Sequence, residues 1–131
     1  MYNVITFCNS TQLPELLNFA NKNNFLWNIL IWHKTNPIPT CNNKYLDDIE
    51  YIFQMKEKGG KKIGGEYKTK SKVYTSSVNK KDKKEFGHPT IKPIQLMEKI
   101  VTNHTNENDL ILDPFMGSGT TLLACKNLNR R

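Results

Sequence analysis

Hydrophobic residues along the chain recur at two spacings, and stretches with one spacing alternate with stretches of the other. Compact runs of β-branched and aromatic residues at 4–8, 26–32 and 50–55 predict strands, and a shorter run at 110–112 predicts a fourth. Helical spacing of apolar residues predicts helices at about 13–20, at 93–103 and from about 120. This alternation of strands and helices is typical of an α/β fold.

The runs also predict how the strands pair. The first run is apolar at nearly every position, as in a strand buried on both faces of a parallel sheet. The second and third are joined by a polar loop with two prolines, Pro37 and Pro39. Because a parallel crossover between them would normally need a helix, an antiparallel pairing is predicted. The expected sheet is therefore mixed.

Residues 110–121 carry the strongest chemical signal, in the order strand, acidic residue, glycine-bearing turn and helix start. There, Asp113 can accept hydrogen bonds from a ligand, while Gly117 and Gly119 allow a close backbone approach and the helix N-terminus supplies free N–H groups. A P-loop would need a lysine before the Ser/Thr, and a dinucleotide fingerprint would need glycine in place of Leu122. An ordinary strand-to-helix turn is the alternative interpretation.

Length and cysteine content limit the class of protein. The 131 residues fit one modest domain that is large enough for a real hydrophobic core. Three widely spaced cysteines indicate neither a disulfide framework nor a zinc site, so a reducing cytoplasm is expected. No run is long enough to span a membrane, and the first residues lack the features of a signal peptide.

Positive charge is concentrated in one segment. The formal net charge is +7, but residues 56–84 alone hold 11 lysines against three acidic residues. Lysines that neutralise phosphates release condensed counterions, so this segment is a candidate for DNA contact; a solvated loop encoded by AT-rich DNA is the alternative. Paired glycines and scarce apolar residues predict that 57–87 is a flexible lysine-rich insertion facing DNA.

Three stretches resemble motifs of the DNA amino-methyltransferases, which modify adenine N6 or cytosine N4 with S-adenosylmethionine. Asp113-Pro-Phe-Met-Gly-Ser-Gly-Thr-Thr121 resembles the family's methionine-side cofactor loop. His88-Pro-Thr-Ile-Lys-Pro93 resembles the element that precedes this loop. Trp32-His-Lys34, with Asn36 and then Glu50-Tyr-Ile52, resembles a third pattern near the family's active-site rim. Two uncommon motifs in the family's order form a strong joint signal.

The resemblance implies a fold and a site. Residues 1–131 would form a single partial methyltransferase domain, an α/β, Rossmann-like fold with an incomplete mixed sheet and flanking helices. No metal is implied. The implied cofactor-binding residues are Lys92, Pro93, Asp113, Pro114, Phe115, Gly117, Ser118, Gly119, Thr120 and Thr121. The candidate substrate or DNA contacts are Lys34 and Asn36, from the third motif, and Lys61, Lys62, Lys68 and Lys70, from the basic segment.

One family motif is absent from the chain. The Asp-Pro-Pro-Tyr type tetrapeptide, which captures the target base, does not occur, so no catalytic residue is expected here. The family's strand order would place that missing strand beside 110–112, whose exposed edge predicts marginal stability, non-family pairing or a second polypeptide. We therefore expect a truncated or split subunit of a prokaryotic or phage-like restriction-modification enzyme. A non-enzymatic relic that binds nucleic acid through its lysines is the alternative.

Overall fold

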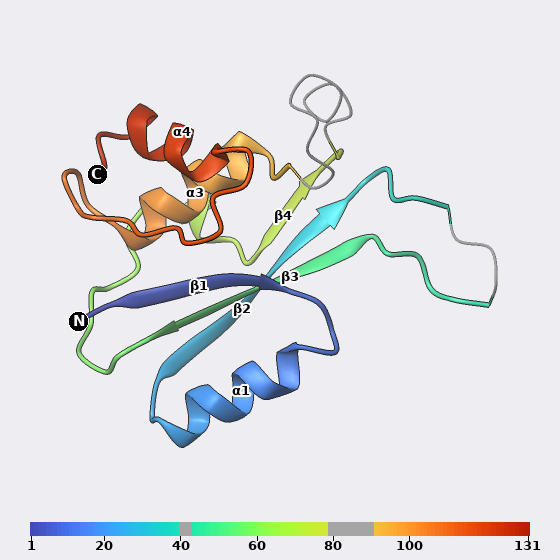
Figure 1. Ribbon diagram of the computed structural model, residues 1–131, viewed down its shortest axis with the longest axis horizontal. Helices are drawn as coiled ribbons and strands as arrows, with labels where there is room; N and C mark the ends of the chain where they lie inside the picture. The colour runs from blue at the N-terminus through green and yellow to red at the C-terminus, as the bar shows by residue number, and fades with distance from the viewer. Residues whose placement is uncertain (40–42, 79–90) are drawn as a thin grey trace. The chain divides into compact units, whose positions relative to one another are not determined.

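The computed structural model describes residues 1–39, 43–78 and 91–131 (Figure 1). The chain divides into two compact units. Unit 1 comprises Met1–Lys62 and Ser71–Ser77, and unit 2 comprises Ile63–Lys70 and Val78–Arg131. Among the described residues, no helix combines the length and apolarity that a membrane span requires.

Unit 1 is built on a four-stranded mixed sheet. Its strands are β1 (Asn3–Cys8), β2 (Leu26–Lys34), β3 (Ile49–Lys56) and β4 (Val73–Ser76), in the order β1-β3-β2-β4. The predicted antiparallel pairing of the second and third strands is confirmed, with Leu26 opposite Lys56 and His33 opposite Ile49. Because β4 pairs parallel with β2, the predicted mixed sheet is confirmed as well.

Three features of this sheet differ from the sequence-based expectation. β1 pairs antiparallel with β3, and among the described strands it has no second neighbour, so its predicted place inside a parallel sheet is wrong. β2 continues through His33 to Lys34, whose backbone N–H donates to the carbonyl of Asp48 at 2.7 Å. β4 was not predicted, because its four residues, two of them polar, lie in a lysine-rich stretch.

Helix α1 (Leu13–Lys22) covers one face of this sheet (Figure 1). Cys8, Ala20 and Phe53 form the buried centre of that contact, and the leucines of α1 pack around them. Pro14 lies in the first turn, where its missing N–H leaves no helical bond unmade. The helical spacing of leucines therefore gave the correct helix and the correct face.

A row of amide side chains crosses three strands of the sheet. Gln54 of β3 is fully buried. Its Oε1 accepts a hydrogen bond from Asn28 Nδ2 of β2 at 2.9 Å, and its Nε2 donates to Asn3 Oδ1 of β1 at 2.7 Å. Since a buried amide without these partners would be costly, the row favours the observed register of β1, β3 and β2 over a slipped one.

Unit 2 contains the short 3-10 helix η1 (Tyr67–Lys70) and the helices α3 (Ile94–His104) and α4 (Thr120–Asn127). The predicted helices at 93–103 and from 120 are confirmed, and η1 was not predicted. α3 packs against α4. The C-terminal ends of the two helices are tied by Arg130, whose Nη2 donates to the Thr105 carbonyl at 3.0 Å and whose backbone N–H donates to Cys125 at 2.8 Å.

The predicted strand at 110–112 does not form a strand in the described chain. Its backbone makes only a short parallel contact, in which Arg131 N–H donates to Asp109 at 2.9 Å and Ile111 N–H donates to Arg131 at 2.6 Å. Leu110 and Leu112 are 79% and 86% exposed. The apolar run is extended but lacks the neighbouring strands that its composition suits.

Replacement of Gln54 tests the amide row. We expect Gln54→Ala to lower the free energy of unfolding by about 2–3 kcal/mol, because it leaves two half-buried amides without their shared partner. Urea denaturation followed by circular dichroism measures the change. Asn18→Ala, at an exposed position of α1, is the control and should change stability by less than about 0.5 kcal/mol. Equal effects of the two substitutions would contradict the assigned role of Gln54.

Candidate functional site

The connection between residue 112 and α4 folds into two consecutive tight turns. Asp113 Oδ1 accepts a hydrogen bond from the backbone N–H of Phe115 at 3.0 Å, which is an Asx turn. The carbonyl of Met116 then accepts from Gly119 N–H at 2.9 Å. The aspartate therefore folds its own loop with one oxygen, and no hydrogen bond to its other oxygen, Oδ2, occurs among the described residues.

Two glycines give this loop its shape. Gly117 has φ +53° and Gly119 has φ +81°, both in the left-handed region that residues with a side chain rarely adopt. Gly119 is the residue before α4, and its carbonyl accepts from Leu123 N–H at 3.0 Å. Within the part of the chain that the structure describes, no side chain caps this end of the helix, so the first N–H groups of α4 face the loop without a capping partner.

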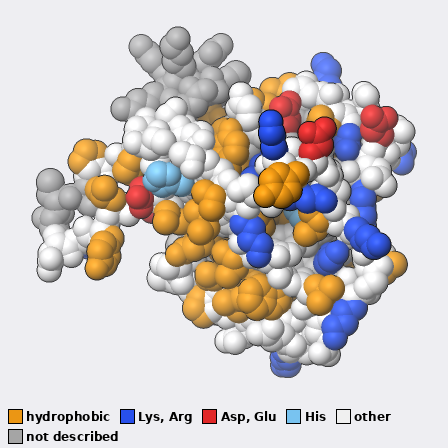
Figure 2. Space-filling view, turned by 180° about the vertical axis from the view of Figure 1, so that it is seen from behind, with side chains coloured by type: hydrophobic (Ala, Val, Ile, Leu, Met, Phe, Trp, Pro, Cys, Tyr) orange, Lys and Arg blue, Asp and Glu red, His pale blue; other side chains and the backbone are white. Residues whose placement is uncertain are grey.

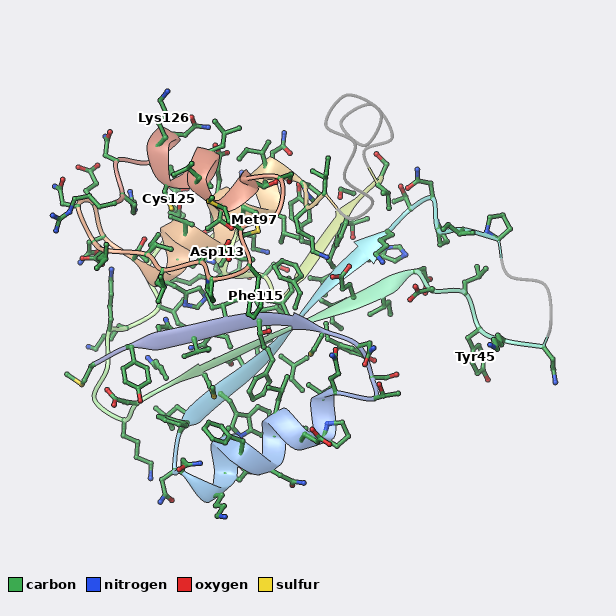
Figure 3. The ribbon with its side chains drawn as sticks, in the orientation of Figure 1. Tyr45, Met97, Asp113, Phe115, Cys125 and Lys126 are labelled. Atoms are coloured by element: carbon green, nitrogen blue, oxygen red, sulfur yellow. The ribbon has the colours of Figure 1, made fainter. Side chains whose placement is uncertain are left out.

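The surroundings of the loop combine exposed apolar groups with a carboxylate. Phe115 is 92% exposed, and Figure 3 labels it with Asp113 in the connection that leads to α4. Burial raises the pKa of the Cys125 thiol, Arg130 opposes that rise, and Asp113 adds to it. The carboxylate thus lies near enough to α4 to act on one of its buried side chains. Among the described residues, no group of three or more His, Cys, Asp and Glu side chains could hold a metal ion.

The structure brings together only part of the predicted site. Residues 113–121 form one continuous element of unit 2. In the same unit, Lys92 and Pro93 precede α3, with the Pro93 carbonyl accepting from Met97 N–H at 3.2 Å. The first three residues of the second motif, 88–90, lie outside the described residues. The assignment of these residues to cofactor binding stays a prediction.

The predicted substrate contacts Lys34 and Asn36 belong to unit 1. Lys34 Nζ lies 3.4 Å from a carboxylate oxygen of Glu50 and 5.3 Å from the ring centre of Trp32. Trp32 is buried, and its Nε1 donates to Ser76 Oγ at 2.9 Å. The ammonium of Lys34 is therefore already engaged within its own sheet.

The basic candidates are divided between the units. Lys61 and Lys62 belong to unit 1, whereas Lys68 and Lys70 lie on η1 in unit 2 and are exposed. Sequence reasoning missed Asn103, which is buried on α3 and donates through Nδ2 to the Thr69 carbonyl of η1 at 2.7 Å. Its only signal in the sequence was a polar residue next to the apolar positions of this helix.

Exposed apolar side chains also mark the connection from β2 to β3. Tyr45 is fully exposed, and Ile38 and Leu46 are largely exposed. Figure 2 shows hydrophobic side chains on this projecting segment, and Figure 3 labels Tyr45 there. His33 and Asp48, 3.9 Å apart, lie at its base.

Comparison with known proteins yields matches over nearly the whole chain. A family model described as DNA methylase matches residues 4–131. The type II methyltransferases M2.LlaDCHI of Lactococcus lactis subsp. cremoris and M2.DpnII of Streptococcus pneumoniae are 38% and 39% identical over 116 residues. These alignments cover 79% of this chain but only 43% of each relative. The chain thus spans less than half the length of these curated relatives.

Solved structures of methyltransferases also match nearly the whole chain, here in fold. The crystal structure of an M1.HpyAVI–SAM complex matches 98% of this chain and 64% of that chain, with a TM-score of 0.79 and 36% identity. The PvuII DNA methyltransferase, described as cytosine-N4-specific, matches 98% of this chain and 57% of that one, with a TM-score of 0.78 and 15% identity.

Substitution of Gly119 tests the geometry of the loop. A Cβ at Gly119 would meet no atom within 4 Å, so Gly119→Ala adds no clash and costs only the left-handed backbone conformation. We expect a loss of about 1 kcal/mol in the free energy of unfolding, measured with urea. Gly60→Ala is the contrasting variant, because its Cβ would lie 2.9 Å from a backbone oxygen although its φ is ordinary. No loss of stability in Gly119→Ala would contradict the left-handed turn.

Proposed function

Because the chain belongs to the DNA methylase family whose model covers residues 4–131, we propose that it contributes the S-adenosylmethionine site of a DNA amino-methyltransferase. The predicted family and its partial Rossmann-like fold, with a mixed sheet and flanking helices, are confirmed. The observation that carries the proposal is the Asp113–Thr121 loop, in which an aspartate, two left-handed glycines and an uncapped helix start follow one another.

The residues of this loop fit the amino-acid end of S-adenosylmethionine. That end carries an ammonium and a carboxylate. Asp113 Oδ2, which accepts no hydrogen bond from the described residues, suits the ammonium, and the first N–H groups of α4 suit an anion. Open space where a Cβ of Gly119 would stand leaves the backbone accessible. M1.HpyAVI, 36% identical to this chain, is described as a complex with SAM.

The chain's contribution to catalysis is binding and orientation. Asp113 is already held by its Asx turn, so little ordering is needed when a cation approaches. When bound, S-adenosylmethionine supplies an electrophilic methyl group. We assign no catalytic residue to this chain, because the tetrapeptide that captures the target base does not occur in its sequence. Lys92 and Pro93, at the start of α3, are the further cofactor contacts that we propose.

DNA is the proposed substrate, and the relatives M2.LlaDCHI and M2.DpnII carry the name type II methyltransferase. The lysines of the 57–87 insertion supply the required positive charge, among them Lys61, Lys62, Lys68 and Lys70. Lys34 and Asn36 are retained as candidate contacts of lower rank, since Lys34 is paired with Glu50. We place this activity in the cytoplasm of a bacterium or of a phage-infected cell.

We further propose that a second polypeptide completes the enzyme. In unit 2, residues 109 and 111 bond toward Arg131, so the backbone groups of Leu110 and Leu112 point to the opposite side of the extended segment. No backbone hydrogen bond to those groups occurs in the described chain, and both side chains are exposed. An apolar edge of this kind suits an added strand.

A second sheet edge, at the end of the described strand order, lies in unit 1. β1 is an edge strand of six residues that contains neither proline nor lysine, the usual protection against edge pairing. Beside it lies a hollow of about 500 Å³, lined by Thr6, Phe7, Cys8, Gln12, Glu15, Leu16 and Phe19. A strand followed by an amphipathic helix, from outside these 131 residues, matches both the edge position of β1 and the hollow beside it.

Calorimetry with S-adenosylmethionine tests the cofactor site. We expect the chain to bind it and Asp113→Asn to weaken binding about tenfold or more, because the substitution removes the charge while its amide oxygen can still accept from Phe115 N–H. Glu107→Gln, at an exposed carboxylate of the same unit, is the control and should bind as tightly as the parent chain. Absence of binding by the parent chain would instead favour the nucleic-acid-binding relic.

Complementation tests the second polypeptide. The part of M2.DpnII that this chain does not match, produced as a separate polypeptide, should restore methyl transfer to DNA when mixed with this chain. Phe19→Glu places a charge in the hollow beside β1 and should lower that activity about tenfold or more. Leu26→Glu, at a similarly exposed position of β2 outside the hollow, should not. Activity of the unmixed chain would contradict the need for a partner.

A further inference from the structure

The segment from Gly64 to Lys70 is fastened to α3 through one residue, Asn103. The Asn103 side chain donates through Nδ2 to the Thr69 carbonyl at 2.7 Å, and its backbone carbonyl accepts from Gly64 N–H at 2.7 Å. Asn103 is 3% exposed. Both bonds cross from the helix to the lysine-bearing segment. We refer to Asn103 with Gly64, Gly65 and Thr69 as the Asn103 clip.

The clip also depends on shape. Gly65 has φ +77°, and a Cβ built on it would lie 2.3 Å from Asn103 Oδ1 and 2.4 Å from Thr69 Oγ1. The Gly65 backbone therefore lies directly against the buried amide. Asn103 Oδ1 has no hydrogen-bond partner among the described residues, and the Gly65 backbone packs against this oxygen without donating to it. Only glycine fits this position.

The other side of the same segment is exposed. Thr69 N–H and Oγ1 both donate to the Glu66 carbonyl, at 3.0 and 2.9 Å, and so close the turn of η1. Lys68 and Lys70 are exposed, and neither has an ion pair within the described chain. Tyr67 beside them is 95% exposed. The Asn103 clip thus fixes the backbone of a segment that presents two lysines and a tyrosine at the surface.

We propose that η1 is a preorganised contact for the phosphates of a nucleic acid and that Asn103 is its positioning residue. This inference rests on the proposed function and deepens it by naming the contact element and its support. A lysine that neutralises a phosphate releases counterions, and a backbone that is already fixed loses less conformational freedom on binding. The exposed tyrosine suits stacking on an unpaired base.

The lysines are tested by the salt dependence of binding. Fluorescence anisotropy with a 20-base-pair duplex between 50 and 200 mM salt gives the slope of log affinity against log salt. Lys68→Gln and Lys70→Gln should each reduce that slope by about 0.9 and the affinity at 100 mM salt by about eightfold. Lys126→Gln, an exposed lysine on α4, is the matched control and should leave the slope unchanged. Unchanged slopes for both η1 variants would overturn the contact.

The clip is tested by variants that keep every lysine. Asn103→Ala and Gly65→Ala should lower the affinity about fivefold with the slope unchanged, because the cations remain but their backbone must be ordered on binding. Asn127→Ala is the matched control. It also removes an asparagine amide, which donates from α4 to Glu98 of α3 at 2.8 Å but is not part of the Asn103 clip. This variant should bind DNA as tightly as the parent chain does. Hydrogen exchange of the Thr69 amide should accelerate in the clip variants only.

The outcomes separate this inference from the function on which it rests. Unchanged affinity in Asn103→Ala with faster Thr69 exchange would overturn the positioning role alone. A parent chain that shows no salt-dependent DNA binding would remove the proposed DNA contact altogether. Poly-L-glutamate bound as tightly as the duplex would overturn the assignment to phosphate. Should Asn103→Ala fail to fold, Gly65→Ala and the exposed lysine variants still decide the question.

Discussion

The packing of α3 against α4 supports every candidate ligand contact in unit 2. Leu96, Ile100 and Val101 are buried on α3, and Ala124 and Cys125 are buried on α4. α3 begins directly after Pro93, the last residue of a family motif, while Asn103 near the other end of the helix fastens η1. The Asp113 loop leads directly into α4. A small apolar interface therefore fixes two polar loops that make few bonds of their own.

Sequence periodicity predicted the elements whose stability comes from their own apolar faces. The helices at 13–22, 94–104 and 120–127 and the antiparallel strands β2 and β3 all follow from local spacing and from the two prolines between those strands. Elements that depend on contacts with a distant segment of the chain were not predictable in this way. β4 pairs with β2 between residues that lie 42 positions apart in the sequence, and η1 depends on Asn103, so neither has a strong local pattern.

The local backbone geometry of the candidate site follows from sequence for a similar reason. The order of Asp113, Gly117 and Gly119 before a helix is local, and the Asx turn and left-handed glycines are local consequences of those residue types. The strand at 110–112 was predicted wrongly because a strand requires neighbours. The apolar run indicates what the segment can pair with, whereas the described chain offers it only residues 129–131. Leu110 and Leu112 are exposed because the described chain gives the segment no strand on its other side.

Gly65 and Gly119 show how the same backbone conformation serves opposite purposes. Both have φ near +80°, and neither φ is readily adopted by a residue with a side chain. At Gly65 the space of the missing Cβ is filled by Asn103 and Thr69, so the glycine allows two segments of the chain to pack closely. At Gly119 that space is open, so the backbone remains accessible to a ligand. Whether the space of the missing Cβ is filled or open therefore distinguishes a loop fixed by protein contacts from a loop whose backbone a ligand can reach.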